Sequence, residues 1–246
     1  MNEPTSPMAT LLSPRPLYVQ VRELMIGRMV QGVWKPGAVL PSEIQLAEEF
    51  GVSQGTVRKA LDALAAENLV IRRQGRGTFV AEHDAERALF HFFHLVGEDG
   101  SRQLPGGTLL SCRSGKASRD ETARLDVTRG TQVVRLRRTR DMRGAAVIFE
   151  MISLPAAMFP GIRDADALPN TLYEFYEGNY GITIVRAEER LRAVPASREA
   201  AAHLGIKPGA PLLEIDRVAF ALDGRPVEWR VSQCDTRHHH YLAELV

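Results

Sequence analysis

Residues 40–61 read LPSEIQLAEEFGVSQGTVRKAL, and this stretch decides the fold of the N-terminal part of the chain. Ser42 and Gln45 are spaced as a capping box, in which the two side chains satisfy each other's free backbone amides at the start of a helix. The apolar face of that helix would consist of Leu46, Ala47 and Phe50. Gly51 ends it, because glycine adopts a left-handed backbone at little cost. The stretch therefore begins with a short amphipathic helix.

A second helix follows directly after the turn at 51–53. Ser53 is a typical N-cap residue, and the spacing of the apolar residues predicts a helix over 54–67. Its buried face would consist of Val57, Ala60, Leu61 and Leu64. Two helices joined by so tight a turn predict a helix-turn-helix, in which the second helix leaves its N-terminal end free for the major groove of DNA.

Regular structure is predicted on both sides of this motif. Apolar residues at helical spacing predict a helix over 17–30. Short strands are predicted over 69–73 and 78–80, and the basic, glycine-rich segment 74–77 between them is typical of a hairpin tip. Together these elements predict a winged helix-turn-helix domain over residues 15–80.

The exposed face of the second helix carries side chains that can contact DNA. The hydroxyl groups of Ser53 and Thr56 suit phosphate oxygens, which helix N-termini also attract. Arg58 suits either a phosphate or the edge of a guanine. The same face also includes Gln54 and Lys59. Each residue has an ordinary alternative role, as a helix cap or as part of a solvated face.

The hairpin tip is a second basic feature. Arg76 lies between Gly75 and Gly77 and could place a guanidinium group in the minor groove. A flexible hairpin without DNA contacts is the alternative. The net charge of the whole chain is only +1, but basic residues outnumber acidic ones between 54 and 80. Such a local excess is expected of a small DNA-reading domain on a neutral body.

Residues 40–61, followed by GRGTFV at 75–80, resemble the DNA-binding domain of the GntR family of regulators. The resemblance covers about residues 16–80 and implies contacts with double-stranded DNA. The matching residues at such positions are Ser42, Ser53, Thr56, Arg58, Gly75, Arg76 and Gly77. Members often have arginine where this chain has Ile44 and Gln54, so the family's usual operator sequence is not expected to carry over.

Composition indicates the class of protein. The chain has 246 residues, of which 44% are hydrophobic and 25% charged, as in a globular protein of one or two domains. No apolar run reaches the roughly 18 residues of a membrane helix. Residues 1–14 are predicted to be a disordered tail and not a signal peptide, so we expect a cytoplasmic protein without membrane contact. Cys112 and Cys234 are interpreted as reduced thiols, and no cofactor or metal is expected.

Residues 81–88 are small and polar, and they are predicted to link the first domain to a second one over 89–246. Longer strands mixed with short helices predict an α+β fold for this second domain. The predicted strands cover 89–96, 108–114, 132–140, 145–154, 183–194, 211–222 and 227–234. The predicted helices cover 119–125, 171–180 and 198–204.

The segment 112–143 is rich in arginine. On a strand, Arg138 and Arg140 point to the same face, and two guanidinium groups on one face can bind a carboxylate or a phosphate. A basic solvent face, or ion pairs with a neighbouring strand, is the alternative. The run His238, His239 and His240 is interpreted as a polar surface, because adjacent side chains diverge and would not share a metal.

Several segments of the second domain resemble the UTRA ligand-binding domain of the HutC-type subfamily. They are residues 144–155, 171–176, 180–183, 186–190 and 223–228. The resemblance covers roughly 90–240 and implies an α+β fold similar to chorismate lyase that binds small effectors. The effector contacts that it implies are Arg138, Arg140, Glu150, Thr171, Tyr173 and Glu228. Members often have a tyrosine pair where this chain has Gln233 and Cys234, which argues against a sugar-type effector.

In these roles, the arginines and a hydroxyl would hold an anion, the carboxylates would accept hydrogen bonds from the effector, and the aromatic ring would form a flat wall. We expect a ligand-responsive transcriptional regulator, most often a repressor in such families, that binds a pseudo-palindromic operator as a homodimer. Its effector would be a small anion. One alternative is a chorismate-lyase-like enzyme, although no nucleophile–base pair is evident. The other is a DNA-architectural protein with a structural second domain.

Overall fold

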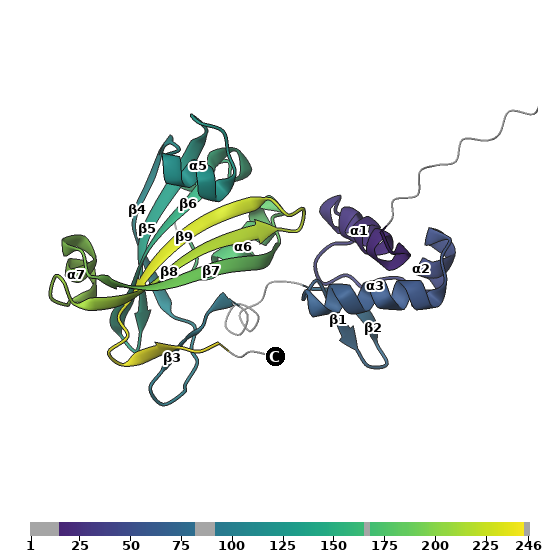
Figure 1. The fold of residues 1–246 in the computed structure, drawn as a ribbon, viewed down its shortest axis with the longest axis horizontal. Coiled ribbons are helices and arrows are strands. Elements are labelled where there is room, and N and C mark those ends of the chain that lie inside the picture. The colour runs from purple at the N-terminus through teal and green to yellow at the C-terminus, as the bar shows by residue number, and fades with distance from the viewer. Residues whose placement is uncertain (1–14, 82–91, 165–167, 244–246) are drawn as a thin grey trace, which may run out of the picture. The chain divides into compact units, whose positions relative to one another are not determined.

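The computed structural model describes residues 15–81, 92–164 and 168–243 (Figure 1). The chain divides into two compact units between Ala81 and Glu82, and we call them the N-terminal and C-terminal units. The predicted tail at 1–14 and residues 82–88 of the predicted linker lie outside the described residues. Ala81 itself is buried, and its backbone N–H donates to the carbonyl of Leu69. It therefore packs with the N-terminal unit.

The N-terminal unit consists of helices followed by a β-hairpin, as the sequence predicts. The elements are α1 (Leu17–Val30), α2 (Glu43–Phe50), α3 (Gln54–Ala66), β1 (Val70–Arg73) and β2 (Gly77–Val80). The strands pair antiparallel, and an isolated bridge joins Val39 to Phe79. The fully buried core includes Met25 of α1, Leu46 of α2, and Val57 and Leu64 of α3. These contacts confirm the predicted winged helix-turn-helix.

Local sequence determines where α2 and α3 begin and where α2 ends. The Ser42 hydroxyl accepts from the Gln45 backbone N–H, and the Gln45 side chain accepts from the Ser42 N–H, which completes the capping box. Gly51 ends α2 with φ = 64° and ψ = 35°. The Ser53 side chain then accepts from the Thr56 N–H at the start of α3. The turn is therefore set by side chains that lie within it.

A Gly51→Ala substitution should destabilise the N-terminal unit by roughly 1–2 kcal/mol, because an L-residue is strained in the left-handed conformation. No atom lies within 4 Å of a Cβ built at Gly51, so backbone strain is the only cause. Urea denaturation measures the loss. The matched control is Gly55→Ala inside α3, where a Cβ meets only Ser53 Oγ at 3.8 Å. That variant should be as stable as the original chain or more so, and equal losses in both variants would contradict the explanation.

The C-terminal unit is built on a six-stranded antiparallel sheet (Figure 1). Its strands are β4 (Gly106–Lys116), β5 (Gln132–Met142), β6 (Ala145–Pro155), β7 (Ile184–Pro195), β8 (Pro211–Ala221) and β9 (Pro226–Cys234). Their spatial order is β4-β5-β6-β9-β8-β7. The helices are α5 (Arg119–Leu125), α6 (Leu172–Tyr180) and α7 (Arg198–Leu204), with 3-10 turns at Ala156–Met158 and Ile162–Asp164. This confirms the predicted α+β class.

The two faces of the sheet are covered by different elements. Leu172, Tyr173 and Tyr176 of α6 pack with Leu136 of β5 and Ile152 of β6 in one buried cluster. On the opposite face, Ala200, Ala201 and Leu204 of α7 pack with Phe149 and Leu212, and α5 lies against β9. The face under α6 carries the candidate site that is described below.

The strand predicted over 89–96, at the start of the C-terminal unit, is wrong in its length. Only β3 (Leu95–Gly97) is a strand within the described part of the predicted strand 89–96, and residues 89–91 lie outside the described residues. The physical reason is its partner: β3 pairs only with the equally short β10 (His239–Tyr241). His239 and His240 are thus ladder residues opposite Gly97 and Val96, a pairing that the surface interpretation of the histidine run did not include.

Among the described residues, no group of three or more His, Cys, Asp or Glu side chains is placed to hold a metal ion. Cys112 and Cys234 are both free thiols, and burial raises the pKa of Cys234. None of the helices within 15–81, 92–164 and 168–243 combines the length and apolar character needed to cross a membrane.

Candidate functional site

The N-terminal end of α3 presents two hydroxyl groups that already have partners. Ser53 Oγ lies 3.2 Å from the Thr56 backbone N and 2.9 Å from Thr56 Oγ1. The hydroxyl of Ser42, at the start of α2, is engaged in the capping box. All three predicted residues therefore stabilise helix ends in the free protein. The capping role and a phosphate contact are compatible, because a hydroxyl can donate one hydrogen bond while it accepts another.

Glu43, the first residue of α2, binds the side chains that the sequence predicts to read DNA. Its Oε2 accepts from Arg58 Nε at 3.0 Å and Nη2 at 2.8 Å, and from Gln54 Nε2 at 3.3 Å. Arg72 of β1 lies 3.7 Å from its Oε1. The hydrogen bond from Arg58 holds the pKa of Glu43 below its usual value. Sequence reasoning missed this residue, although its place just after the N-cap puts it next to the turn.

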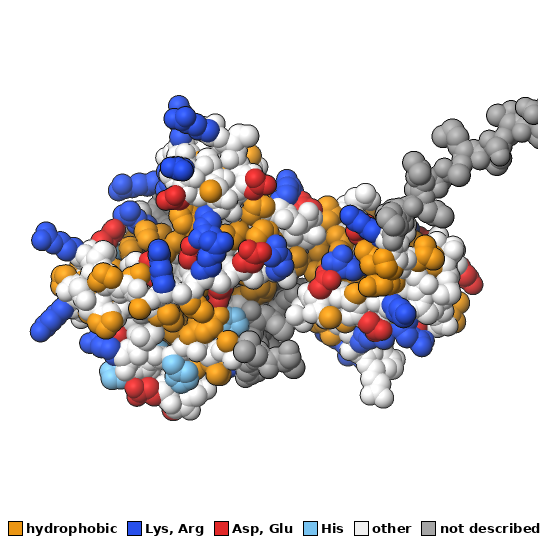
Figure 2. All heavy atoms as spheres, in the orientation of Figure 1, with side chains coloured by type: hydrophobic (Ala, Val, Ile, Leu, Met, Phe, Trp, Pro, Cys, Tyr) orange, Lys and Arg blue, Asp and Glu red, His pale blue; other side chains and the backbone are white. Residues whose placement is uncertain are grey.

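The hairpin tip and α3 leave other predicted residues exposed. Gly75 and Gly77 have φ of 68° and 107°, and the Arg76 backbone N–H donates to the Arg73 carbonyl at 2.9 Å. The side chains of Arg76 and Lys59 are exposed. On the face that Figure 2 shows, basic side chains of the N-terminal unit lie next to acidic ones. Ion pairs such as Arg72–Asp62 and Arg28–Glu49 contribute to this mixture.

The C-terminal unit has a partly open cavity on the face of the sheet that carries α6. Four of the six predicted effector residues line it: Arg138, Arg140, Thr171 and Tyr173. The other lining residues are Phe92, Phe93, Leu104, Asn170, Leu172, Arg217 and Arg230. The prediction that Arg138 and Arg140 share a face agrees with their common place in this cavity.

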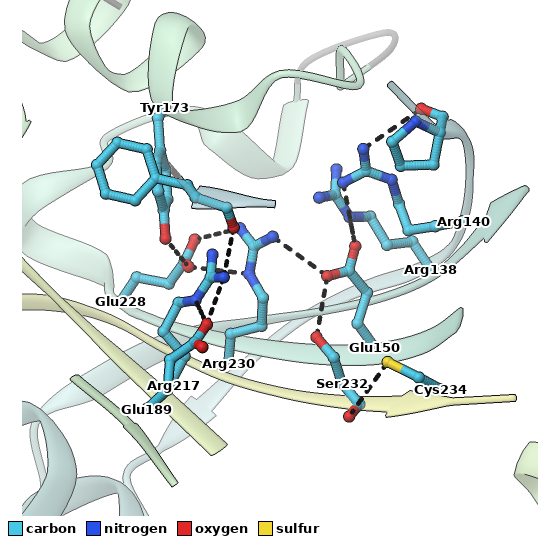
Figure 3. Close-up of polar contacts among 12 residues, drawn as sticks. Arg138, Arg140, Glu150, Tyr173, Glu189, Arg217, Glu228, Arg230, Ser232 and Cys234 are labelled. Carbon is cyan, nitrogen blue, oxygen red and sulfur yellow. Dashed lines mark hydrogen bonds and ion pairs between the residues drawn. The ribbon is translucent and has the colours of Figure 1, made fainter. Parts of the chain in front are cut away.

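A row of charged side chains, all but one of them buried, crosses the sheet beneath the cavity (Figure 3). We call it the arginine–glutamate cluster, and its members are Arg138, Arg140, Glu150, Glu189, Arg217, Glu228 and Arg230. Strand register produces the row, since Arg138 lies opposite Glu150 across β5 and β6, and Arg217 lies opposite both Arg230 and Glu189. Burial of so many charges is tolerated only because they are paired.

At one end of the cluster, three arginines surround Glu150, which is 2% exposed. It accepts from Arg138 Nε at 2.7 Å, from Arg230 Nη1 at 3.2 Å and from Arg140 Nη1 at 3.4 Å. Burial alone would raise the pKa of Glu150, but these three guanidinium groups hold it well below its usual range. The carboxylate is therefore ionised, and the arginines separate it from the cavity.

Glu228 plays the same role at the other end, and it is fully buried. Arg230 donates to it from Nε and Nη2 at 2.9 and 2.8 Å, and the hydroxyls of Tyr173 and Tyr176 donate to it at 3.1 and 2.9 Å. Burial and the nearby Glu228 raise the pKa of Tyr173 to about 12. Both predicted carboxylates thus lie behind the cavity wall, with their oxygens occupied by protein donors.

The sequence reasoning missed Arg217, Arg230 and Glu189. For Arg230 a signal existed, because it follows Glu228 by two residues and so shares its face on a strand. Arg217 follows Asp216 in β8, and it donates to Glu189 and to the Phe92 carbonyl. Its partner Glu189 lies on the edge strand β7. Only the order of the strands brings these residues beside Glu228.

Comparisons with known proteins match both units. Residues 17–80 match the model for bacterial regulatory proteins of the gntR family, and residues 101–240 match the UTRA domain. The transcriptional repressor NagR of Bacillus subtilis is 31% identical over 88% of this chain and 89% of its own length. A probable fructoselysine utilization operon repressor of Escherichia coli is 25% identical over 86% and 87%.

A solved structure is similar as well. PhnF from Mycobacterium smegmatis has a TM-score of 0.56 and 27% identity, over 92% of this chain and 99% of that one. The two curated relatives are named as transcriptional repressors, so the enzyme interpretation is not supported. The chain belongs to the GntR family of bacterial transcriptional regulators and carries a UTRA domain.

Proposed function

We propose that this protein is a cytoplasmic, ligand-responsive repressor that binds a pseudo-palindromic operator as a homodimer and responds to a small anionic effector. One observation carries the proposal. A single chain combines a helix-turn-helix with arginine at its reading end and a cavity lined by four arginines. The first feature suits DNA, and the second suits a small anion.

The DNA-binding part rests on the exposed end of α3 and on the hairpin tip. The first backbone amides of a helix have no partner within the helix, and together with the hydroxyls of Ser53 and Thr56 they favour phosphate oxygens. Arg58 is half exposed and bound to Glu43, so DNA would replace a carboxylate partner by a phosphate or a base. Arg76 and Lys59 would add basic contacts. Ile44 and Gln54 would give this protein its own operator preference.

The regulatory part rests on linkage. If an effector in the cavity lowers the affinity for the operator by some factor, DNA lowers the affinity for the effector by the same factor. Two copies of the N-terminal unit in a symmetric dimer would read two half-sites, which explains a pseudo-palindrome. Repression is proposed because relatives such as NagR are named repressors.

The proposal is tested by selecting DNA from a random library with the full chain and sequencing the bound fraction. We expect a short inverted repeat and a footprint that covers both halves. Affinity should fall steeply with salt, because phosphate contacts release counterions. The proposal would be contradicted if the selected DNA shared no common sequence. It would also be contradicted if the selected DNA carried a single, unrepeated half-site and the protein sedimented as a monomer.

An Arg58→Ala substitution should weaken binding to the selected operator by roughly 1–3 kcal/mol if Arg58 contacts a base. Fluorescence anisotropy with operator and scrambled DNA measures the effect. A loss on the operator alone indicates base contact, whereas an equal loss on both indicates a phosphate contact. The matched control is Arg225→Ala, since Arg225 is also an exposed arginine paired with one carboxylate, Asp223, but lies in the C-terminal unit. Equal losses in the two variants would contradict a reading role for Arg58.

A further inference from the structure

The charges of the arginine–glutamate cluster do not balance, because the cluster has four arginines and three glutamates. Arg217 pairs with Glu189, and Arg230 makes its two-pronged contact with Glu228. Arg138 and Arg140 are left to share Glu150 with a further bond from Arg230. Within the cluster, one positive charge is therefore in excess, at the end where Arg138 and Arg140 lie beside Glu150 (Figure 3).

Arg138 also has an unused donor at this point. Its side chain is 4% exposed, and its Nη2 is the one buried side-chain nitrogen or oxygen of the described residues that has no hydrogen-bond partner. A buried donor without a partner is unfavourable, and a ligand atom can remove that penalty. Burial, together with the charges of Arg138 and Arg230, lowers the pKa of Arg140 to about 10. Arg140 still carries its charge at neutral pH, in a site that disfavours positive groups.

The N-terminus of α6 faces the same cavity. Asn170, the N-cap residue Thr171, and the first helical residues Leu172 and Tyr173 all line it. The Thr171 side chain makes no capping hydrogen bond to the backbone and instead donates to Glu174 at 2.8 Å. The amides of a first helical turn favour an anion. This feature and the unpartnered nitrogen of Arg138 point independently to the same kind of ligand.

The remaining walls limit what the rest of the ligand can be. They are apolar: Phe92, Phe93, Leu104, Leu172 and the ring of Tyr173. Phe92 and Tyr173 pack edge to face with their ring centres 5.0 Å apart. Neither Glu150 nor Glu228 lines the cavity, so neither carboxylate accepts hydrogen bonds from ligand hydroxyls. Asn170, Thr171 and Tyr173 are the lining side chains that can accept a hydrogen bond, so a ligand rich in hydroxyl groups would leave most of its donors unsatisfied there.

We propose that the cavity binds a small monocarboxylate with an apolar body and few hydroxyl groups, rather than a sugar phosphate. This inference rests on the proposed function, in which the cavity is the effector site. One carboxylate neutralises the single excess positive charge and gives Arg138 Nη2 an acceptor, while the apolar walls contact the body. A phosphate ester would bring close to two negative charges at neutral pH and so leave a buried excess of negative charge.

The test uses the full chain and four probes: benzoate, its neutral analogue benzamide, phenyl phosphate and glucose 6-phosphate. Titration calorimetry and thermal unfolding give the affinity and the stabilisation. Benzoate should bind at least about tenfold more tightly than each of the others, since a charge-assisted hydrogen bond to a buried arginine is worth that factor or more. This ranking needs no variant, so it holds even if a substitution in the cluster prevents folding.

The matched variants are Arg138→Lys and Arg192→Lys. Lysine at 138 keeps the charge beside Glu150 but removes the free guanidinium nitrogen, and benzoate binding should fall about tenfold. Arg192 also pairs with a buried glutamate, Glu214, but its own side chain is 70% exposed, and it does not line the cavity. Its replacement should leave benzoate binding unchanged. Tighter binding of benzamide or of either phosphate, no binding of any probe, or full benzoate affinity in Arg138→Lys would overturn the inference.

The operator experiment separates this inference from the proposed function. If a phosphate probe releases the protein from operator DNA and Arg138→Lys abolishes that release, the cavity is the effector site but the carboxylate class is wrong. If the ligand-free chain selects no operator at all, the proposed function fails, whatever the ranking of the four probes.

Discussion

A Glu150→Gln substitution should lower the free energy of unfolding of the C-terminal unit by about 3–5 kcal/mol, the range typical of breaking a buried ion pair from one side. Glutamine has nearly the shape of glutamate but no charge. Arg138, Arg140 and Arg230 would then lose their shared counter-charge at a position that is 2% exposed. They would have to separate or admit water, and either change disrupts the packing of β5, β6 and β9.

Tryptophan fluorescence can follow this unit alone. The chain has two tryptophans, of which Trp34 lies in the N-terminal unit and Trp229 on β9. A Trp34→Phe background therefore limits the signal to Trp229 during urea denaturation. The control in that background is Glu214→Gln, because Glu214 is also buried but its arginine partner, Arg192, is 70% exposed and can turn to water. That control should lose no more than about 1 kcal/mol, and similar losses in both variants would refute the central role of Glu150.

The N-terminal unit could be predicted nearly in full because its signals are local. Ser42, Gly51 and Ser53 each act on backbone groups within a few residues, and the structure places the predicted caps at those positions. What the sequence did not reveal is the contact between Glu43 and Arg58. These residues lie fifteen positions apart on different helices, and their meeting depends on how α2 packs against α3.

The cavity, in contrast, depends mostly on contacts between residues that are far apart in the sequence. The period of two along β5 predicts that Arg138 and Arg140 share a face, and this needs no knowledge of neighbours. The pairing of Glu150 with Arg230 across 80 residues of sequence depends on β9 lying beside β6. Hairpin patterns in a sequence identify only the pairing of strands that follow each other along the chain. Strand order therefore decides that the two predicted carboxylates lie behind arginines instead of facing the ligand.

Acid should destabilise the C-terminal unit between about pH 4.5 and pH 2, and Glu121 of α5 should account for up to about 3 kcal/mol of the loss. Burial alone would raise the pKa of Glu121, but hydrogen bonds from Arg135, Ser118 and Ser153 lower it to about 2. Above pH 4.5 the group is ionised in both the folded and the unfolded chain, so its contribution is complete. As the pH falls, the unfolded chain binds the proton first, and the contribution is lost by about pH 2.

Glu121→Gln tests this assignment when urea denaturation is repeated across the acid range in the Trp34→Phe background. The variant should be less stable than its parent at neutral pH, and the gap should close as the pH approaches 2. Glu199→Gln is the matched control, because Glu199 of α7 pairs with Arg137 of β5 just as Glu121 pairs with Arg135, but both members of the Glu199 pair are more than 40% exposed. An exposed pair contributes little, so the control should follow the parent at every pH. A gap for Glu121→Gln that stays constant down to pH 2 would mean that packing of the side chain, and not its charge, provides the stability.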